Sequence, residues 1–105
     1  MATYVMLVKL SDEAAANIKD AKRGRDAGKK AAAAIGIEWK RSYLLMGDDY
    51  DVLVILDAPN EKTIAKFSLL GAMSGTVSTR ILRAFTEAEA DELVESVGEL
   101  TALVS

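Results

Sequence analysis

The sequence predicts a single α+β domain built on a four-stranded antiparallel sheet, and two observations favour this class. Four segments rich in β-branched and aromatic residues alternate with segments that carry the apolar spacing and the capping residues of helices. Two of the strand segments, residues 4–8 and 52–56, are apolar without interruption, which indicates strands covered on both faces. A chain of 105 residues can bury a sufficient core without disulfides or metals, so we expect one domain over residues 1–105.

The first strand and the first helix are defined by their boundaries. Apolar and β-branched side chains over residues 3–10 predict the strand. Ser11 then supplies a side-chain oxygen that can cap a helix, and two acids follow in the first turn, where the helix dipole favours them. Because glycine inside a helix costs about 1 kcal/mol relative to alanine, we expect an interruption around residues 23–25. Gly36 should end the helix as a C-terminal cap.

The second and third strands should form a hairpin. Residues 37–46 alternate along the chain in a way that is typical of an edge strand with one partly polar face. Strict alternation places Trp39, Arg41 and Tyr43 on the same face of this strand. Residues 47–49 supply the turn, and residues 50–58 return as the third strand.

A third segment of helix and a fourth strand follow the hairpin. Asn60, directly after a proline, can cap a helix over residues 61–74. Its inward-facing residues should be Ile64, Phe67, Leu70 and Met73. Residues 76–85 predict the fourth strand. One face of that strand should carry Val77, Thr79, Ile81, Arg83 and Phe85, and the other Ser78, Arg80, Leu82 and Ala84.

The last helix is amphipathic and acidic. Thr86 and Glu89 match the capping box, in which the two side chains each accept a hydrogen bond from the other residue's backbone N–H. The helix should run to about residue 103. Its apolar stripe is Leu93, Val97, Leu100 and Val104. Its acids are Glu87, Glu89, Asp91, Glu92, Glu95 and Glu99.

The order of strands and helices predicts how these elements assemble. The order β, α, β, β, α, β with a terminal helix is the split βαβ, or ferredoxin-like, arrangement, and right-handed crossovers put both inserted helices on one face of the sheet. If about six large apolar side chains on the other face stayed in water, the stabilisation lost would be on the order of 10 kcal/mol, comparable with the stability of a typical domain. We therefore expect a second copy of the chain to cover that face in a homodimer, as a dimeric α/β barrel.

Several blocks of the sequence resemble one known family, the GYD domain family. The blocks are residues 4–10, 50–54, 57–60 and 82–87, and the similarity extends over about residues 3–93. Two residues separate Gly47 from Tyr50 here, which indicates a longer turn or a bulge than the family's Gly-x-Tyr-Asp element has. The resemblance implies a dimeric ferredoxin-like α+β barrel. It implies no reaction, because the wider superfamily includes cofactor-free monooxygenases, isomerases, haem-dependent enzymes and ligand-sensing domains.

Composition excludes several classes of function. The chain has no cysteine and no histidine, which removes thiol chemistry and the residue most used for acid-base catalysis, zinc ligation and haem binding, so we predict no cofactor. A net charge of -3 gives no case for nucleic acid or an anionic membrane as partner. No apolar run spans a bilayer and no charged leader is evident, so we expect a cytoplasmic protein.

Two charged clusters have ordinary interpretations. Four acids near the third strand lack the spacing of a calcium loop, and we favour a polar turn with strand-end charges over a metal site. These acids are Asp48, Asp49, Asp51 and Asp57. The first helix carries a basic cluster without interleaved aromatic residues, which is typical of a solvated helix face. Its residues are Lys19, Lys22, Arg23, Arg25, Lys29 and Lys30. This cluster could also attract the acidic last helix, within one chain or between chains.

Seven residues are candidates for a ligand-binding site between the sheet and its partner. They are Trp39, Arg41 and Tyr43 on the second strand, Tyr50 and Asp51 at the start of the third, and Arg80 and Arg83 on the fourth. An aromatic and cationic lining suits a small anionic or aromatic ligand, although packing would also explain the aromatic residues.

Three functional hypotheses follow. The first is a homodimeric module that binds a small molecule. The alternative is a cofactor-independent monooxygenase or isomerase acting on a small aromatic or enolic substrate, in which Tyr50 and Asp51, or Trp39 with an arginine, would handle protons. In the third, dimerisation serves only a higher oligomer.

Overall fold

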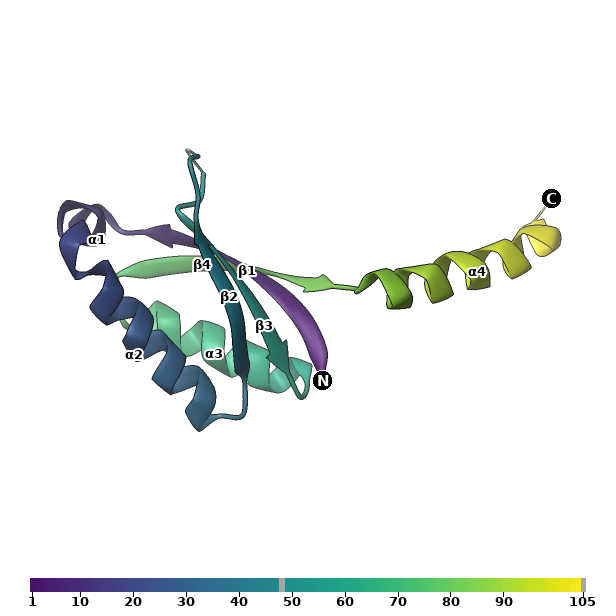
Figure 1. Ribbon diagram of the computed structural model, residues 1–105, viewed down its shortest axis with the longest axis horizontal. Helices are drawn as coiled ribbons and strands as arrows, with labels where there is room; N and C mark the ends of the chain where they lie inside the picture. The colour runs from purple at the N-terminus through teal and green to yellow at the C-terminus, as the bar shows by residue number, and fades with distance from the viewer. Residues whose placement is uncertain (48, 105) are drawn as a thin grey trace.

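The chain folds into a four-stranded antiparallel sheet with helices packed on one of its faces (Figure 1). The structure, a computed structural model, describes residues 1–47 and 49–104. In chain order the elements are β1 (Ala2–Leu10), α1 (Asp12–Ala16), the short 3-10 helix η1 (Ile18–Asp20), α2 (Ala21–Ala34), β2 (Glu38–Leu44), β3 (Val52–Ala58), α3 (Glu61–Met73), β4 (Val77–Ala84) and α4 (Glu87–Val104). The strand order β2-β3-β1-β4 confirms the predicted α+β class, its ferredoxin-like element order and the edge position of β2.

The core lies between the sheet and the helices α2 and α3. Alternate residues of the two central strands point into it, because successive strand side chains face opposite sides of a sheet. The buried strand residues are Tyr4, Met6 and Val8 of β1 and Val54, Leu56 and Ala58 of β3. Ala32 of α2, with Ile64 and Phe67 of α3, closes the core from the helical side. Each central strand therefore has three alternate residues of one face buried by its own chain.

Two residues predicted to face inward from α3 do not. Leu70 is 42% exposed and Met73 is 83% exposed, whereas the predicted Ile64 and Phe67 are buried. The helix is rotated so that Gly71 faces β4, where a Cβ atom at that position would lie 3.6 Å from Val77 Cγ2. Gly71 thus faces the sheet, whereas the apolar spacing had assigned the inward positions to Leu70 and Met73.

The interruption predicted around residues 23–25 was placed wrongly. The helical segment breaks earlier, at Asn17, and α2 then runs without a break through Gly24. The Ser11 cap is confirmed, since its Oγ accepts the Ala14 N–H at 3.1 Å. Gly36 follows the end of α2 with φ +80°, the left-handed conformation that favours glycine in a C-terminal cap.

A bulge in β2 overturns the predicted alternation of that strand. Trp39 pairs with Leu56 and Arg41 pairs with Ile55, so two residues, Lys40 and Arg41, oppose one residue of β3. The extra residue reverses the alternation. Trp39 therefore lies on the face packed by helices, while Arg41 and Tyr43 lie on the opposite face.

The last helix, α4, extends away from the rest of the chain (Figure 1). The chain is consequently elongated, with extents of 56 × 31 × 20 Å and a radius of gyration of 16.7 Å, against about 13 Å for a compact domain of this length. The predicted stripe residues Leu93, Val97, Leu100 and Val104 are all more than 45% exposed. Within residues 1–47 and 49–104, no helix has the length and apolar character required to cross a bilayer.

Candidate ligand-binding face

The sheet surface that faces away from α2 and α3, called the open face below, is organised in rows of paired residues. The strand registers define two rows that run from β2 across β3 and β1 to β4. The first row is Tyr43, Leu53, Leu7 and Arg80. The second row is Arg41, Ile55, Val5 and Leu82.

These rows give the open face an apolar centre with a cation at each edge. The apolar centre consists of Val5, Leu7, Leu53, Ile55 and Leu82. Arg41 on edge strand β2 and Arg80 on edge strand β4 lie on either side of it, and strand spacing puts the two edges about 14 Å apart. Such a surface can hold the apolar body of a small molecule while a guanidinium contacts an acidic group on it.

Arg41 and Tyr43 form a pair on the β2 edge. Arg41 Nη1 donates to Tyr43 Oη at 3.4 Å, and this hydrogen bond is the main reason that the pKa of Arg41 is raised above its ordinary value. Both side chains are exposed, Tyr43 to 48%. The phenol oxygen thus accepts a hydrogen bond from the guanidinium at the β2 edge of the open face.

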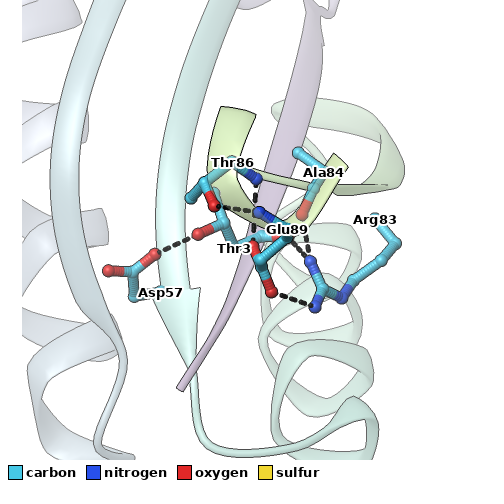
Figure 2. Close-up of polar contacts among 6 residues, drawn as sticks. All are labelled: Thr3, Asp57, Arg83, Ala84, Thr86 and Glu89. Carbon is cyan, nitrogen blue, oxygen red and sulfur yellow. Dashed lines mark hydrogen bonds and ion pairs between the residues drawn. The ribbon is translucent and has the colours of Figure 1, made fainter. Parts of the chain in front are cut away.

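One end of the open face is bounded by a row of polar residues. Asp57 accepts a hydrogen bond from Thr3 Oγ1 at 2.8 Å, which Figure 2 shows, and lies 3.6 Å from Lys40 Nζ. Lys40 also lies 3.4 Å from a Glu38 carboxylate oxygen, and the hydrogen bond to Glu38, followed by the charges of Glu38 and Asp57, raises the pKa of Lys40. These groups satisfy one another and mark where the apolar centre ends.

Asp51 joins the hairpin to the end of β1. Its Oδ2 accepts the Leu10 N–H at 2.8 Å and lies 3.7 Å from Lys9 Nζ. Its backbone N–H donates to the Val8 carbonyl, and its own carbonyl accepts the Leu45 N–H, each at 2.8 Å. The carboxylate is therefore occupied in holding two strands together. Of the predicted turn over residues 47–49, Asp48 lies outside the described residues.

The predicted residues near this carboxylate do not assemble into one site. Tyr50 is half-buried beside Asp51 at the start of the third strand segment, and Asp57 lies near the other end of β3. The described acids of that group, Asp49, Asp51 and Asp57, are thus divided between the two ends of the third strand segment.

Trp39 contacts the helical layer. A Cβ atom added to Gly28 of α2 would lie 3.3 Å from its indole ring, so glycine makes room for the ring there. The indole N–H is buried and has no hydrogen-bond partner among the described residues. Trp39 is therefore separated by the thickness of the sheet from Arg41, with which the sequence had grouped it.

Arg83 also lies on the helix-packed face. It pairs with Tyr4 across the sheet, and its guanidinium carbon lies 5.7 Å from the Tyr4 ring centre and 4.4 Å from that of Phe85. Arg80 points to the open face, as the predicted alternation of the fourth strand requires. The two arginines of β4 consequently serve different surfaces.

Arg83 fixes the start of α4 (Figure 2). Its Nη1 donates to the carbonyl oxygens of Thr3, at 3.1 Å, and of Ala84, and its Nη2 lies 3.5 Å from Glu89 Oε2. The predicted capping box is confirmed: Thr86 N–H donates to Glu89 Oε1 at 3.0 Å and Glu89 N–H donates to Thr86 Oγ1 at 3.2 Å. The direction in which α4 leaves β4 is thus set by a connected network.

Of the seven predicted site residues, the open face brings together Arg41, Tyr43 and Arg80. The sequence prediction omitted Leu82, which lies between Arg80 and Ala84 on that face and is 44% exposed. Alternation along residues 76–85 had placed Leu82 beside Arg80, so the signal for it was present. The basic cluster of the first helical segment is exposed, as predicted, and four of its residues line a shallow hollow together with Asp20, Asp26 and Ala27. They are Lys19, Lys22, Arg23 and Lys30.

Comparison with known proteins supports the family resemblance. The model of the GYD domain matches residues 4–94, which include most of β1, all of β2, β3 and β4, and the first turns of α4. No curated protein and no solved structure matches the chain.

Proposed function

The chain belongs to the GYD domain family, and we propose that it acts as a homodimer that binds a small anionic molecule with an apolar body between the open face and the second copy. The observation that carries this proposal is the pair of rows on the open face, in which four apolar side chains of β1 and β3 lie between Arg41 on β2 and Arg80 on β4, with Leu82 beside Arg80. In this proposal the second copy covers the apolar centre, and the acidic group of the ligand pairs with an arginine at its edge.

The need for a cover supports the second copy. Fully burying a large apolar side chain contributes roughly 1.5 to 3 kcal/mol, so covering the partly buried apolar centre is worth several kcal/mol. A second copy presents the same apolar surface, and a two-fold axis brings the two together as a closed dimer. In the dimeric α/β barrel, the two open faces would meet in this way.

The two edges support the class of ligand. A guanidinium binds a carboxylate through parallel hydrogen bonds, and it stacks on aromatic surfaces. Arg41 is already oriented by Tyr43, and Arg80 is exposed on the opposite edge. An aromatic carboxylate has both the flat apolar body and the acidic group that this surface can hold.

A panel of aromatic carboxylates, beginning with benzoate, salicylate and 1-naphthoate, tests the proposal. We expect at least one to raise the melting temperature, because a ligand that binds only the folded state stabilises it. R41Q and R80Q should each weaken binding in calorimetry by about tenfold, equivalent to about 1.4 kcal/mol. R25Q is the matched control, since Arg25 is exposed on α2 in the other layer.

Two results would contradict this function. One is the absence of any thermal shift across the panel at millimolar ligand. The other is binding that R25Q weakens as much as R41Q does, which would reflect net charge and not the open face.

The enzymatic alternative has less support from the geometry. Asp51 is occupied by the Leu10 N–H, and Trp39 lies on the other side of the sheet from Arg41. The Asp51 carboxylate is therefore already engaged by a backbone donor, and Trp39 does not share a face of the sheet with Arg41.

A further inference from the structure

The apolar stripe of α4 is exposed and has no cover among the described residues of its own chain. Six large apolar residues of this helix are between 48% and 86% exposed. They are Leu93, Val94, Val97, Leu100, Leu103 and Val104. The contacts of Arg83 with Thr3, Ala84 and Glu89 hold the start of the helix so that it extends away from its own sheet (Figure 1). Within the described residues this surface is left in water, and a partner that covered it would stabilise it.

The spacing of the stripe is that of a helix that packs against another helix. Apolar residues recur at intervals of three, four, three and four, which is the a and d pattern of the heptad abcdefg. The a positions are Ala90, Val97 and Val104, and the d positions are Leu93 and Leu100. With 18 residues, α4 is about 27 Å long, so the stripe extends over two heptads.

The charges of α4 permit a partner identical to itself. The helix has six acids and no lysine or arginine, so two copies would repel if acids met at the interface. Beyond the first turn, however, the acids fall at b, c and f, on the side opposite the stripe. They are Asp91, Glu92, Glu95 and Glu99. The e and g positions that flank the stripe there are uncharged, namely Val94, Ser96, Thr101 and Leu103.

We propose that α4 pairs with α4 of a second copy through this stripe, in antiparallel orientation. The globular part of each chain is attached at the N-terminal end of α4, so a parallel pair would force both globular parts to the same end. An antiparallel pair places them at opposite ends of a 27 Å helix pair. This contact is separate from the open face, and a chain that uses both contacts assembles beyond the dimer.

The basic cluster on α2 is a surface whose charge could attract the acidic α4. Segment 19–30 carries six basic and two acidic residues, all exposed, and its shallow hollow is lined by lysine, arginine and aspartate side chains with one alanine. Docking there would satisfy the acids of α4 but leave its apolar stripe in water. Pairing through the stripe covers the apolar residues and leaves the acids in water.

A nitroxide label at Ser96, a g position near the middle of α4, tests the pairing directly. The chain has no cysteine, so S96C gives a single labelled site. We expect an electron-electron distance of less than roughly 20 Å, because packed helix axes lie about 8 to 10 Å apart and the two g positions of an antiparallel pair lie on the same side of the interface, and a signal that falls when unlabelled protein is mixed in. L93A/L100A should weaken the association at least tenfold. E92A/E99A, the matched change on the acidic side, should leave the distance and the association unchanged.

Further measurements decide the remaining outcomes. Alanine is the strongest helix former, so circular dichroism should show that L93A/L100A keeps its helix content. The distance should persist in I55R, a change confined to the open face. Ligand binding at Arg41 should persist in L93A/L100A. Failure of this proposal is therefore distinct from failure of the proposed function. The proposal is overturned if no such distance occurs, if I55R abolishes it, or if E92A/E99A removes it while L93A/L100A does not.

Discussion

At the scale of single residues, Asp51 shows how one side chain can connect two strands that are far apart in the sequence. The Leu10 N–H lies at the end of β1 and has the Asp51 carboxylate as its acceptor at 2.8 Å. A partly buried backbone donor left without a partner costs about 1 to 3 kcal/mol, more than a typical surface ion pair contributes. The hydrogen bond to the backbone is thus the main contribution of this residue, and the contact with Lys9 adds less.

Removal of this carboxylate should therefore destabilise the fold measurably. D51A leaves the Leu10 N–H without its acceptor, and we expect the free energy of unfolding to fall by about 1 to 3 kcal/mol in urea denaturation. Y50F is the matched control one residue earlier and should change stability by less than about 0.5 kcal/mol. A D51A protein as stable as the parent, or a greater loss in Y50F, would contradict this assignment.

The residues of β2 show where single-residue prediction from sequence fails. Alternation correctly sorted β4, including Arg80 and Arg83, because that strand pairs with β1 without a register shift. The same rule failed between Trp39 and Arg41, where a bulge admits an extra residue. The same order of apolar and polar residues is compatible with a regular strand and with a bulged strand. The sequence alone therefore does not show that the residues after the bulge change face. The space for the Trp39 indole beside Gly28 depends on packing between α2 and β2, and it could not be predicted from the sequence either.

At the scale of elements, the start of α4 depends on one ionised carboxylate. The pKa of Glu89 is lowered below its ordinary value of 4.5, first by the hydrogen bond from Thr86 N–H and also by the Thr86 hydroxyl and Arg83, with partial opposition from desolvation. Since the folded-state pKa is the lower one, the stabilisation is present above pH 4.5 and is lost as the pH falls through the folded-state pKa. Acid should therefore loosen the first turn of α4.

This pH dependence can be measured by NMR titration of the Glu89 carboxyl carbon. We expect its midpoint to lie below 4.5, and the amide of Thr86 should lose protection from hydrogen exchange over the same pH range. In E89Q the amide oxygen can still accept the Thr86 N–H, as glutamine does in a capping box, but the pH-dependent loss of protection at Thr86 should disappear. A Glu89 midpoint at or above 4.5, or an unchanged pH dependence in E89Q, would argue against the network in Figure 2.

Element boundaries were predictable where capping chemistry is local. Ser11, Asn60 and Thr86 each cap the helix that the sequence assigned to them, with side-chain oxygens accepting backbone N–H groups three residues on. The interruption predicted near Gly24 does not occur. The propensity cost of that glycine is only about 1 kcal/mol, and packing of the continuous helix α2 offsets it. Local signals with a geometric mechanism were reliable, whereas small energetic penalties gave way to packing.

At the scale of the whole molecule, the uninterrupted apolar runs of β1 and β3 gave the most useful prediction. They implied strands apolar on both faces, and the structure buries one face of each under helices while Val5, Leu7, Leu53 and Ile55 lie on the other. The sequence also indicated that the helices would cover only one face of the sheet. It could not indicate the direction of α4. That direction depends on contacts of Arg83 with β1, which is far from it in the chain, and with Glu89, whose side chain also belongs to the capping box of the helix.

A charge placed in the apolar centre tests whether a second copy covers the open face. I55R should be made in the L93A/L100A chain, so that pairing through α4 cannot hold copies together. In that background we expect the parent to sediment as a dimer at micromolar concentration and I55R to sediment as a monomer, because an unpaired charge is costly to bury at an interface. The dissociation constant should rise at least 100-fold, or about 2.8 kcal/mol.

A33R adds the same charge at an exposed position of α2 in the other layer and should leave the dimer intact. A folded monomer in the parent, or dissociation in A33R equal to that in I55R, would mean that the apolar centre tolerates water, and both the dimer and the ligand site between its copies would then be wrong.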